Sequence, residues 1–331
     1  MSRRKPLPSL ANLPTLGPND AIGSADSCIQ HTLLPPTLRD PTNPSLPLSS
    51  TIFHALYHSI PWQTMHHAGG PVPRLVAAQA QPGTPDDPTA VPVYRHPSDR
   101  APKSEPFSRW VKLVREHAEV AVGHPLNHVL IQLYRGGEDY ISEHSDKTLD
   151  VVRGSSIVNV SFGAQRTMRL RRKKAPSTKE DVAVAGTELE KEDAAVGAPR
   201  ETQRVVLPHN SLFVLGPRTN QFWLHAIGAD KRAAAERSEE EKAYEGMRIS
   251  LTFRQIGTFL SADGKLIWGQ GATKKTRNEA RRVVVGDEEQ TERMVRAFGV
   301  ENRLAEGFDW GKTYGDGFDV LHFREEDEEG Y

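Results

Sequence analysis

A histidine and an aspartate separated by a single residue stand out in the middle of the chain. His144 and Asp146 follow a Gly-rich turn that begins after Tyr134. In an extended segment, side chains two positions apart point to the same side and can reach one metal ion. A His-x-Asp triplet is common by chance, so it predicts a metal site only when a third ligand completes it.

His225 is the candidate for that third ligand. It lies near the end of a predicted strand, after the aromatic pair Phe222 and Trp223. Two histidines and one carboxylate on one face of an octahedral ion leave three positions open, which suits Fe(II) that must also bind O₂. Either histidine alone is more often an ordinary surface or core residue, so the prediction depends on the three residues together.

A later strand pattern carries two arginines on one side. Strand alternation places four polar side chains on the same face: Arg248, Ser250, Thr252 and Arg254. If this face borders an internal cavity, the two arginines require an anionic ligand. A planar guanidinium can hold a carboxylate through two hydrogen bonds. Pairing with carboxylates elsewhere in the chain is the alternative, more so for Arg254 than for Arg248.

Short β segments follow a helical start. Helices are predicted from about residue 51 to Ile60 and from Ser108 to Gly123, while 66–106 is expected to be mostly irregular with one strand near 91–94. Runs of β-branched, aromatic and aliphatic residues predict strands at 127–134, 156–162, 167–171, 205–207, 211–215, 221–226 and 248–254. This order predicts a mainly β protein with flanking helices, a double-stranded β-helix or jelly roll.

Composition divides the chain into three parts. Residues 1–50 are rich in Pro, Ser, Asn and Thr and are expected to be disordered. The β domain is expected over 51–257, with solvated insertions at 173–203 and 229–246. Residues 258–331 form a C-terminal extension of unknown role, in which 288–298 has helical character.

The overall composition excludes several classes of protein. The formal net charge of the 331 residues is -1, so binding of a nucleic acid would depend on local patches. A single cysteine, Cys28, rules out an internal disulfide and a Cys-based zinc cluster. The chain has no apolar run long enough to span a bilayer and no secretory signal after its first residues. We expect a monomer without membrane association, in the nucleus or cytoplasm.

The order of these features resembles the AlkB-like family of Fe(II)/2-oxoglutarate dioxygenases. The resemblance covers about residues 53–257 and is closest over 127–170 and 205–256. It is carried by Tyr134 before the Gly-rich turn, Ile141 ahead of His144, the Val-Ser-Phe-Gly run at 160–163, His225, and the strand from Arg248 to Arg254.

The resemblance implies a cofactor, a co-substrate and a reaction. Fe(II) would be bound by His144, Asp146 and His225. Arg248 would hold the distal carboxylate of 2-oxoglutarate, with Arg254 supporting the pocket and Tyr134 donating a hydrogen bond. The implied reaction is oxidative demethylation of alkylated nucleobases in DNA or RNA.

Two residues of the implied co-substrate pocket depart from the family pattern. Gln132 and Ser250 stand where the family commonly has asparagine. Both side chains are polar and can still reach the co-substrate, so the cofactor assignment stands.

The substrate side departs further from the family pattern. Family members that demethylate nucleobases place an acidic residue two positions after the metal aspartate, whereas this chain has Thr148 there and Asp150 two positions later. Either Asp150 takes over the contact with the base, or the protein does not act on such bases. Tyr94 is a candidate for a lid over a flipped base. Arg169 and Arg171 belong to a basic cluster that could contact phosphates or simply be solvated.

Two other functions stay open at this point. The same chemistry could act on a protein side chain or a small metabolite, which Thr148 and the near-neutral net charge favour. A catalytically silent binding module could keep the fold without the reaction, although the intact set of metal ligands argues against it.

Overall fold

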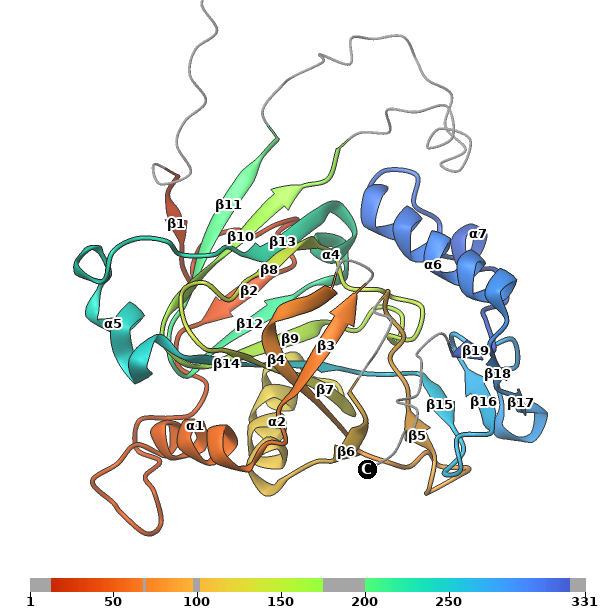
Figure 1. Ribbon diagram of the computed structural model, residues 1–331, viewed down its shortest axis with the longest axis horizontal. Helices are drawn as coiled ribbons and strands as arrows, with labels where there is room; N and C mark the ends of the chain where they lie inside the picture. Colours follow the sequence, from red (N-terminus) through yellow and green to blue (C-terminus); the bar gives the residue numbers. More distant parts are fainter. Residues whose placement is uncertain (1–12, 68–69, 98–101, 175–199, 322–331) are drawn as a thin grey trace, which may run out of the picture.

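Two β-sheets packed face to face form the body of the protein (Figure 1). The structure is a computed structural model, and it describes residues 13–67, 70–97, 102–174 and 200–321. In the larger sheet the strand order is β2-β12-β9-β14-β7-β4-β3, with β6 beside β4, and in the smaller sheet it is β1-β11-β10-β13-β8. The predicted jelly roll is confirmed.

The strands of the larger sheet are β2 (Cys28–Gln30), β3 (Gln63–His67), β4 (Gly70–Ala80), β6 (Ser104–Pro106), β7 (His128–Tyr134), β9 (Ile157–Gly163), β12 (Ser211–Leu215) and β14 (Arg248–Arg254). Those of the smaller sheet are β1 (Thr15–Leu16), β8 (Ile141–His144), β10 (Arg166–Arg172), β11 (Thr202–Leu207) and β13 (Trp223–Ile227). The predicted strand at 221–226 is only partly a strand, because the short helix α4 (Pro217–Phe222) leads into β13.

Helices α1 (Leu48–Ser59) and α2 (Arg109–Val122) cover the outer face of the larger sheet (Figure 1). Their buried faces share one apolar core with the alternate residues Ile249, Leu251 and Phe253 of β14. This leaves the polar residues of β14 facing the space between the two sheets. Both helices were predicted, and α2 ends at Gly123, whose φ of 72° is left-handed. Ser108 occupies the N-cap position without a side-chain capping hydrogen bond.

The N-terminal segment differs from its predicted disorder. β1 pairs in parallel with β11 and β2 pairs with β12, so residues 13–50 extend both sheets. Ile22 is fully buried, and the Leu34 backbone exchanges two hydrogen bonds with the side chain of Asn210. These partners lie far away in the sequence, so the segment has no local periodicity to predict from. Residues 1–12 of the predicted disordered segment lie outside the described residues.

The region 66–106 is also more regular than predicted. The long strand β4 pairs with β7 over Leu75–Ala80 and with β3 near its start. Its prolines, Pro71 and Pro73, precede the part that pairs with β7, so their missing N–H groups cost no hydrogen bond to β7. Proline content therefore misled the sequence-based prediction.

The two predicted insertions are described only in part. Residues 175–199 of the first lie outside the described residues. The second contains the 3₁₀ turns η2 (Ala234–Glu236) and η3 (Ala243–Gly246) around the short helix α5 (Glu239–Lys242), which Ser238 caps.

The C-terminal extension folds against the jelly roll. A four-stranded sheet joins β5 (Val91–Pro92) to β15 (Thr258–Leu260), β16 (Leu266–Gly269) and β17 (Arg281–Arg282). The 3₁₀ turn η4 (Arg277–Glu279) precedes the last of these strands, and β18 (Val284–Val285) pairs with β19 (Val320–Leu321). Helices α6 (Glu288–Arg303) and α7 (Trp310–Tyr314) share a second apolar core that includes Leu149 of the jelly roll. The predicted helix over 288–298 is confirmed and extends to Arg303.

Candidate metal and co-substrate site

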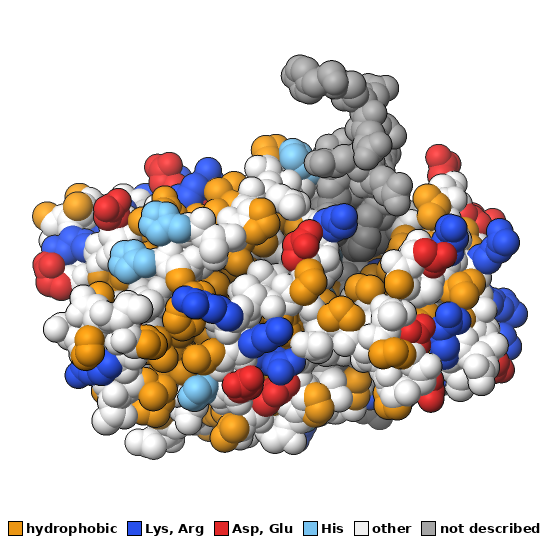
Figure 2. All heavy atoms as spheres, turned by 90° about the horizontal axis from the view of Figure 1, so that it is seen from below, with side chains coloured by type: hydrophobic (Ala, Val, Ile, Leu, Met, Phe, Trp, Pro, Cys, Tyr) orange, Lys and Arg blue, Asp and Glu red, His pale blue; other side chains and the backbone are white. Residues whose placement is uncertain are grey.

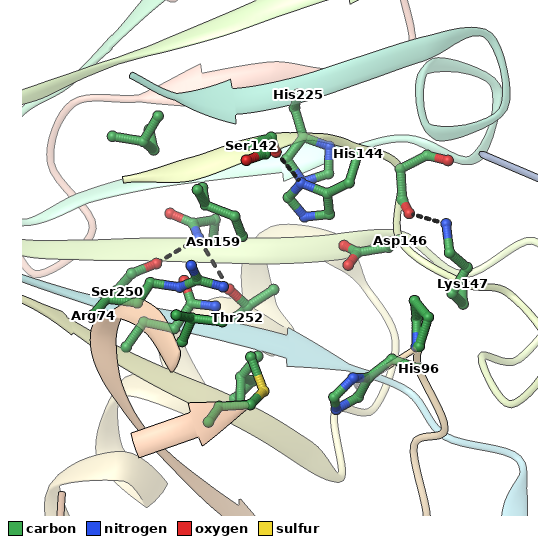
Figure 3. A pocket seen from close by; sticks show the side chains of 18 of the residues that line it. Arg74, His96, Ser142, His144, Asp146, Lys147, Asn159, His225, Ser250 and Thr252 are labelled. Atoms are coloured by element: carbon green, nitrogen blue, oxygen red, sulfur yellow. Dashed lines mark hydrogen bonds between the residues drawn. The ribbon is translucent and has the colours of Figure 1, made fainter. Parts of the chain in front are cut away.

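Two neighbouring strands bring the three predicted metal ligands together. His144 ends β8 and pairs directly with His225 on β13, so that their ring centroids lie 4.2 Å apart. Asp146 lies two residues after the end of β8, and Figure 3 shows its carboxylate on the same side as the two rings. One ligand atom from each of the three side chains lies within 4.8 Å of the other two. This spacing fits a single metal ion.

Both histidines are suited to bind as neutral imidazoles. Nδ1 of His144 donates to the Ser142 carbonyl at 2.8 Å, which leaves Nε2 with its lone pair toward the cluster. Burial, followed by the neighbouring His225, lowers the pKa of His144 to about 3. Burial also lowers the pKa of His225. Neutral rings are the form that coordinates a metal.

Asp146 is held through its backbone and kept ionised. Its N–H donates to Oδ1 of Asn220, and Nδ2 of Asn220 donates to its carbonyl oxygen, both at 2.9 Å. Its Oδ1 accepts from Arg254 at 2.7 Å and from the Tyr94 hydroxyl at 3.4 Å. Burial alone would raise the pKa of Asp146, but Arg254 and the two histidines outweigh it, so the pKa lies below its ordinary value.

A cavity of about 590 Å³ extends from this cluster to Arg248. Arg248 is only 1% exposed, and its Nη2 donates to Asn159 at 3.0 Å and to Ser161 at 2.8 Å. Nε and Nη1 of Arg248 have no hydrogen-bond partner among the described residues. Burial lowers the pKa of Arg248 to about 10, so the group is still cationic near neutral pH. A buried cation with two unused donors fits an anionic ligand.

The other residues predicted to form the co-substrate pocket lie around Arg248 or line the same cavity. The Tyr134 ring lies 5.2 Å from the guanidinium carbon of Arg248, and its hydroxyl donates to Gln132 at 3.1 Å. Ser250 lines the same cavity and accepts a hydrogen bond from Asn159 at 2.7 Å. The residues present therefore fit Fe(II) at the cluster and the distal carboxylate of 2-oxoglutarate at Arg248.

Arg254 lies at the metal end of the cavity rather than beside Arg248. Besides its bond to Asp146, its guanidinium carbon lies 4.1 Å from the centroid of the Tyr94 ring. Tyr94 lines the cavity as predicted. Arg254 is thus placed to stabilise the ligand carboxylate and the adjacent end of a bound co-substrate.

Asp150 does not face the cavity, contrary to its predicted role as a base contact. It is fully buried in an ion pair with Arg95, with Nη2 and Oδ1 2.6 Å apart. Thr148 is likewise occupied, since its hydroxyl donates to Glu301 of α6 at 2.5 Å. Neither residue lines the cavity. Asp150 and Thr148 are instead bonded to side chains that lie 55 and 153 positions away in the sequence, respectively.

The predicted phosphate-binding arginines are also engaged elsewhere. Arg169 and Arg171 of β10 pair with Glu143 of β8 at 2.8 and 3.3 Å. Strand alternation places Met168, which lines the cavity, on the opposite face from these arginines. They therefore lie outside the cavity.

Several residues that line the cavity were not predicted from the sequence. Asn159 interrupts an apolar strand, and this polar residue in a buried run was a usable signal. Arg74 of β4 lines the cavity, and its Nη1 donates to the Tyr140 carbonyl at 3.0 Å. Lys147 also lines it, next to the ligand Asp146 (Figure 3). Nothing in the local sequence distinguished Arg74 or Lys147 from surface cations.

Comparison with known proteins agrees with this geometry. The family model of the 2OG-Fe(II) oxygenase superfamily matches residues 34–254, which include all three metal ligands and both arginines. The chain belongs to this superfamily. Within the superfamily, proteins of the AlkB type are similar to this chain, in agreement with the resemblance seen in its sequence.

The chain is similar to several curated proteins over about half of its length. It is 32% identical over 155 residues to the DNA oxidative demethylase ALKBH2 of Mus musculus, covering 46% of this chain and 52% of that protein. It is 31% identical over 156 residues to ALKBH2 of Homo sapiens, covering 46% and 48%. It is 27% identical over 155 residues to the alpha-ketoglutarate-dependent dioxygenase alkB homolog 3 of Homo sapiens, covering 46% and 45%. The chain thus spans about half the length of these relatives.

Among solved structures, one described as the structure of OsALKBH1 gives a TM-score of 0.40 at 13% identity, covering 70% of this chain and 98% of that chain.

Proposed function

We propose that this oxygenase uses Fe(II), 2-oxoglutarate and O₂ to demethylate alkylated nucleobases in DNA or RNA. The proposal is supported by two features that share one cavity. They are the ligand set His144, Asp146 and His225, and Arg248, which has two hydrogen-bond donors without a partner among the described residues. A metal centre alone would serve many functions. A metal centre beside a buried cation that lacks an anion fits a 2-oxoglutarate oxygenase.

The residues of the chain have separate tasks in this reaction. Bound Fe(II) and 2-oxoglutarate supply the oxidising chemistry, with release of succinate and carbon dioxide. Arg248 and Tyr134 orient the far carboxylate of the co-substrate and so fix which end of it reaches the metal. Arg254 keeps Asp146 ionised and oriented. The buried side chains around the cavity exclude bulk water.

A flipped base is a suitable occupant of the remaining cavity. Tyr94 and His96 line it, with ring centroids 5.6 Å apart, and aromatic faces can stack on an unpaired base. The similar ALKBH2 proteins are named DNA oxidative demethylases. DNA or RNA is therefore the proposed partner, with repair of alkylation damage as the proposed role.

One observation favours a second candidate substrate. Among the described residues that line the cavity, Asp146 is the only acidic one, and it belongs to the metal site. The cavity thus offers a positively charged alkylated base no free carboxylate from this part of the chain. A side chain of a protein or a small metabolite, processed by the same chemistry, is the second candidate.

On one face of the molecule, the surface charge does not favour binding of a nucleic acid. Figure 2 shows the lower side of the molecule in Figure 1, where acidic and basic side chains are interspersed and hydrophobic ones gather in a hollow. We expect nucleic acid to approach the cavity near β4 and α6, whose residues line it. None of the described helices is long and apolar enough to cross a membrane. A monomer in the nucleus or cytoplasm stays our expectation.

The test measures succinate from 2-oxoglutarate with Fe(II) and O₂, with and without methylated single- and double-stranded oligonucleotides. His144→Ala is the inactive control, and Cys28→Ser, outside the cavity, is the matched active control. Succinate that rises with methylated oligonucleotide, together with demethylated base, would support the proposal.

Two other results would change the proposed function. Slow succinate formation that no oligonucleotide changes, and that His144→Ala abolishes, would keep the oxygenase and favour a protein or metabolite substrate. No succinate from a wild-type protein that binds Fe(II) and 2-oxoglutarate would favour a silent binding module.

A further inference from the structure

Helix α6 of the C-terminal extension lies against the loop that carries the metal ligand Asp146. Figure 1 shows α6 at one side of the jelly roll, near the ends of the strands that bear the site. The family model ends at residue 254, so α6 lies outside the part of the chain that it matches. Any contribution of α6 to the active site therefore comes from outside the matched residues.

One face of α6 borders the cavity itself. Four residues at positions i, i+3, i+4 and i+7, which share one helical face, line it: Val295, Phe298, Gly299 and Asn302. Met294 and Ala297, on the neighbouring face, are buried in the core of the extension. The helix is therefore fixed by its own core while it presents a wall to the cavity.

Asn302 of this helix bonds the part of the metal loop next to Asp146. Its Oδ1 accepts from the backbone N–H of Ser145 at 2.9 Å and from Nζ of Lys147 at 3.0 Å. The same ammonium donates to the Ser145 carbonyl at 2.7 Å. Ser145 and Lys147 are the two neighbours of Asp146, so one side-chain oxygen joins both sides of the ligand.

Glu301 bonds the next residue of the metal loop, Thr148. Its carboxylate accepts from the backbone N–H of Thr148 at 3.1 Å and from the Thr148 hydroxyl, and the Tyr314 hydroxyl donates to its other oxygen. Glu301 is only 3% exposed, so these bonds are shielded from water. Residues 145, 147 and 148 are thus all bonded to α6.

The backbone of Asp146 is therefore held from two sides. Asn220, inside the shared domain, bonds the N–H and carbonyl of Asp146 itself, while α6 bonds the residues around it. Groups that orient a metal ligand affect metal affinity although they never touch the metal. A loop that leaves the end of β8 has no ladder hydrogen bonds of its own to fix it.

We propose that α6 is a working part of the active site and that Asn302 is a positioning residue for the metal loop. The proposal rests on the proposed metal site at His144, Asp146 and His225. The proposal gives the C-terminal extension a role, because removal of the Asn302 contact would loosen the metal loop and weaken metal binding. Co(II), a spectroscopic substitute for Fe(II), reports this without turnover.

The test compares three variants of the full chain by Co(II) titration, using the visible absorption of the bound ion. Asn302→Leu keeps the shape but removes the acceptor, and we expect about tenfold weaker Co(II) binding. Asn302→Asp keeps an acceptor oxygen beside Lys147 and should stay within about twofold of wild type. Arg296→Ala, an exposed residue on the same helix, is the matched control and should not change the affinity.

Each outcome has one meaning. Equal Co(II) affinity of wild type and Asn302→Leu would overturn the role of Asn302, as would equally weak binding by Asn302→Leu and Asn302→Asp. Thermal unfolding of the metal-free variants separates a loosened loop from a protein that has not folded. A wild-type protein that binds no Co(II) would instead contradict the proposed metal site.

Discussion

Two buried arginines of this protein have opposite surroundings. Arg95, fully buried where the jelly roll meets the extension, has an acceptor for each guanidinium nitrogen. Asp150 accepts from Nε and Nη2, and the Phe318 carbonyl accepts from Nη1 at 2.7 Å. Arg248, almost as deeply buried, uses only Nη2 among the described residues.

The difference separates a structural cation from a ligand-binding one. A folded protein seldom leaves buried donors without partners, because each costs free energy comparable to a lost hydrogen bond. Arg95 is complete and needs nothing further. Arg248 carries unused donors into a cavity, which indicates that an anion completes it. Burial alone would not have distinguished the two residues.

The largest effect should come from breaking the complete pair. Asp150→Ala leaves the Arg95 charge buried without its partner, so we expect the free energy of unfolding to fall by about 3–5 kcal/mol. Chemical denaturation with circular dichroism measures this loss. The double variant Arg95→Met with Asp150→Leu removes both charges and should recover most of the loss. A single variant as stable as wild type would contradict the structural role of the pair.

The next effect should appear in ligand binding and not in stability. Arg248→Leu removes the cation that holds the co-substrate, and we expect 2-oxoglutarate to bind on the order of a hundredfold more weakly. Because the unused donors disappear as well, the free energy of unfolding without ligand should not fall as it does in Asp150→Ala. Calorimetric titration with 2-oxoglutarate tests this. Unchanged affinity would remove Arg248 from the co-substrate site.

A conservative change sharpens the same comparison. Arg248→Lys keeps the positive charge but loses the planar fork that matches a carboxylate. We expect 2-oxoglutarate to bind about tenfold more weakly, between wild type and Arg248→Leu. Affinity equal to that of Arg248→Leu would mean that hydrogen-bond geometry, and not charge, decides the binding.

The smallest effect concerns His209, a partly buried histidine that is neutral in the folded protein. The Gly163 N–H donates to Nδ1 of His209 at 2.9 Å, and burial lowers the pKa of His209 to about 4. Between about pH 6.5 and pH 4 the unfolded chain binds more protons at this residue, so stability falls as the pH falls. His209→Asn keeps an acceptor and should reduce this loss by at most about 1.4 kcal/mol per pH unit.

Denaturation at several pH values measures the slope for both proteins. The comparison of wild type and variant cancels the other buried histidines, which remain in both. Identical slopes would mean that the pKa of His209 is not lowered in the folded protein.

The sequence predicted the metal cluster because few residue types can bind the ion. The choice of His144, Asp146 and His225 depends on residue type and on order along the chain, both of which are visible without coordinates. The polar face of β14 was predictable for a similar reason, since strand alternation is a local property. Both predictions depended on the order of residue types or on strand alternation, and the structure brings these residues together in one cavity.

Predictions that needed a distant partner were the ones that changed. Residues 13–50 were predicted to be disordered, yet they pair with strands that lie more than 180 positions later. Thr148 and Asp150 were candidates for contact with a base. In the structure they are bonded to Glu301 and Arg95 instead.

The sequence by itself thus determined the fold class, the candidate metal ligands and the polar face of β14. Tertiary structure alone decided which polar side chains keep unused hydrogen-bond donors in the cavity and which are satisfied elsewhere. It also placed Asn302 of the extension beside the metal loop, 157 positions from Ser145. Local chemistry limits what a residue can bind, but only the folded chain sets which of its possible partners lies within hydrogen-bond distance.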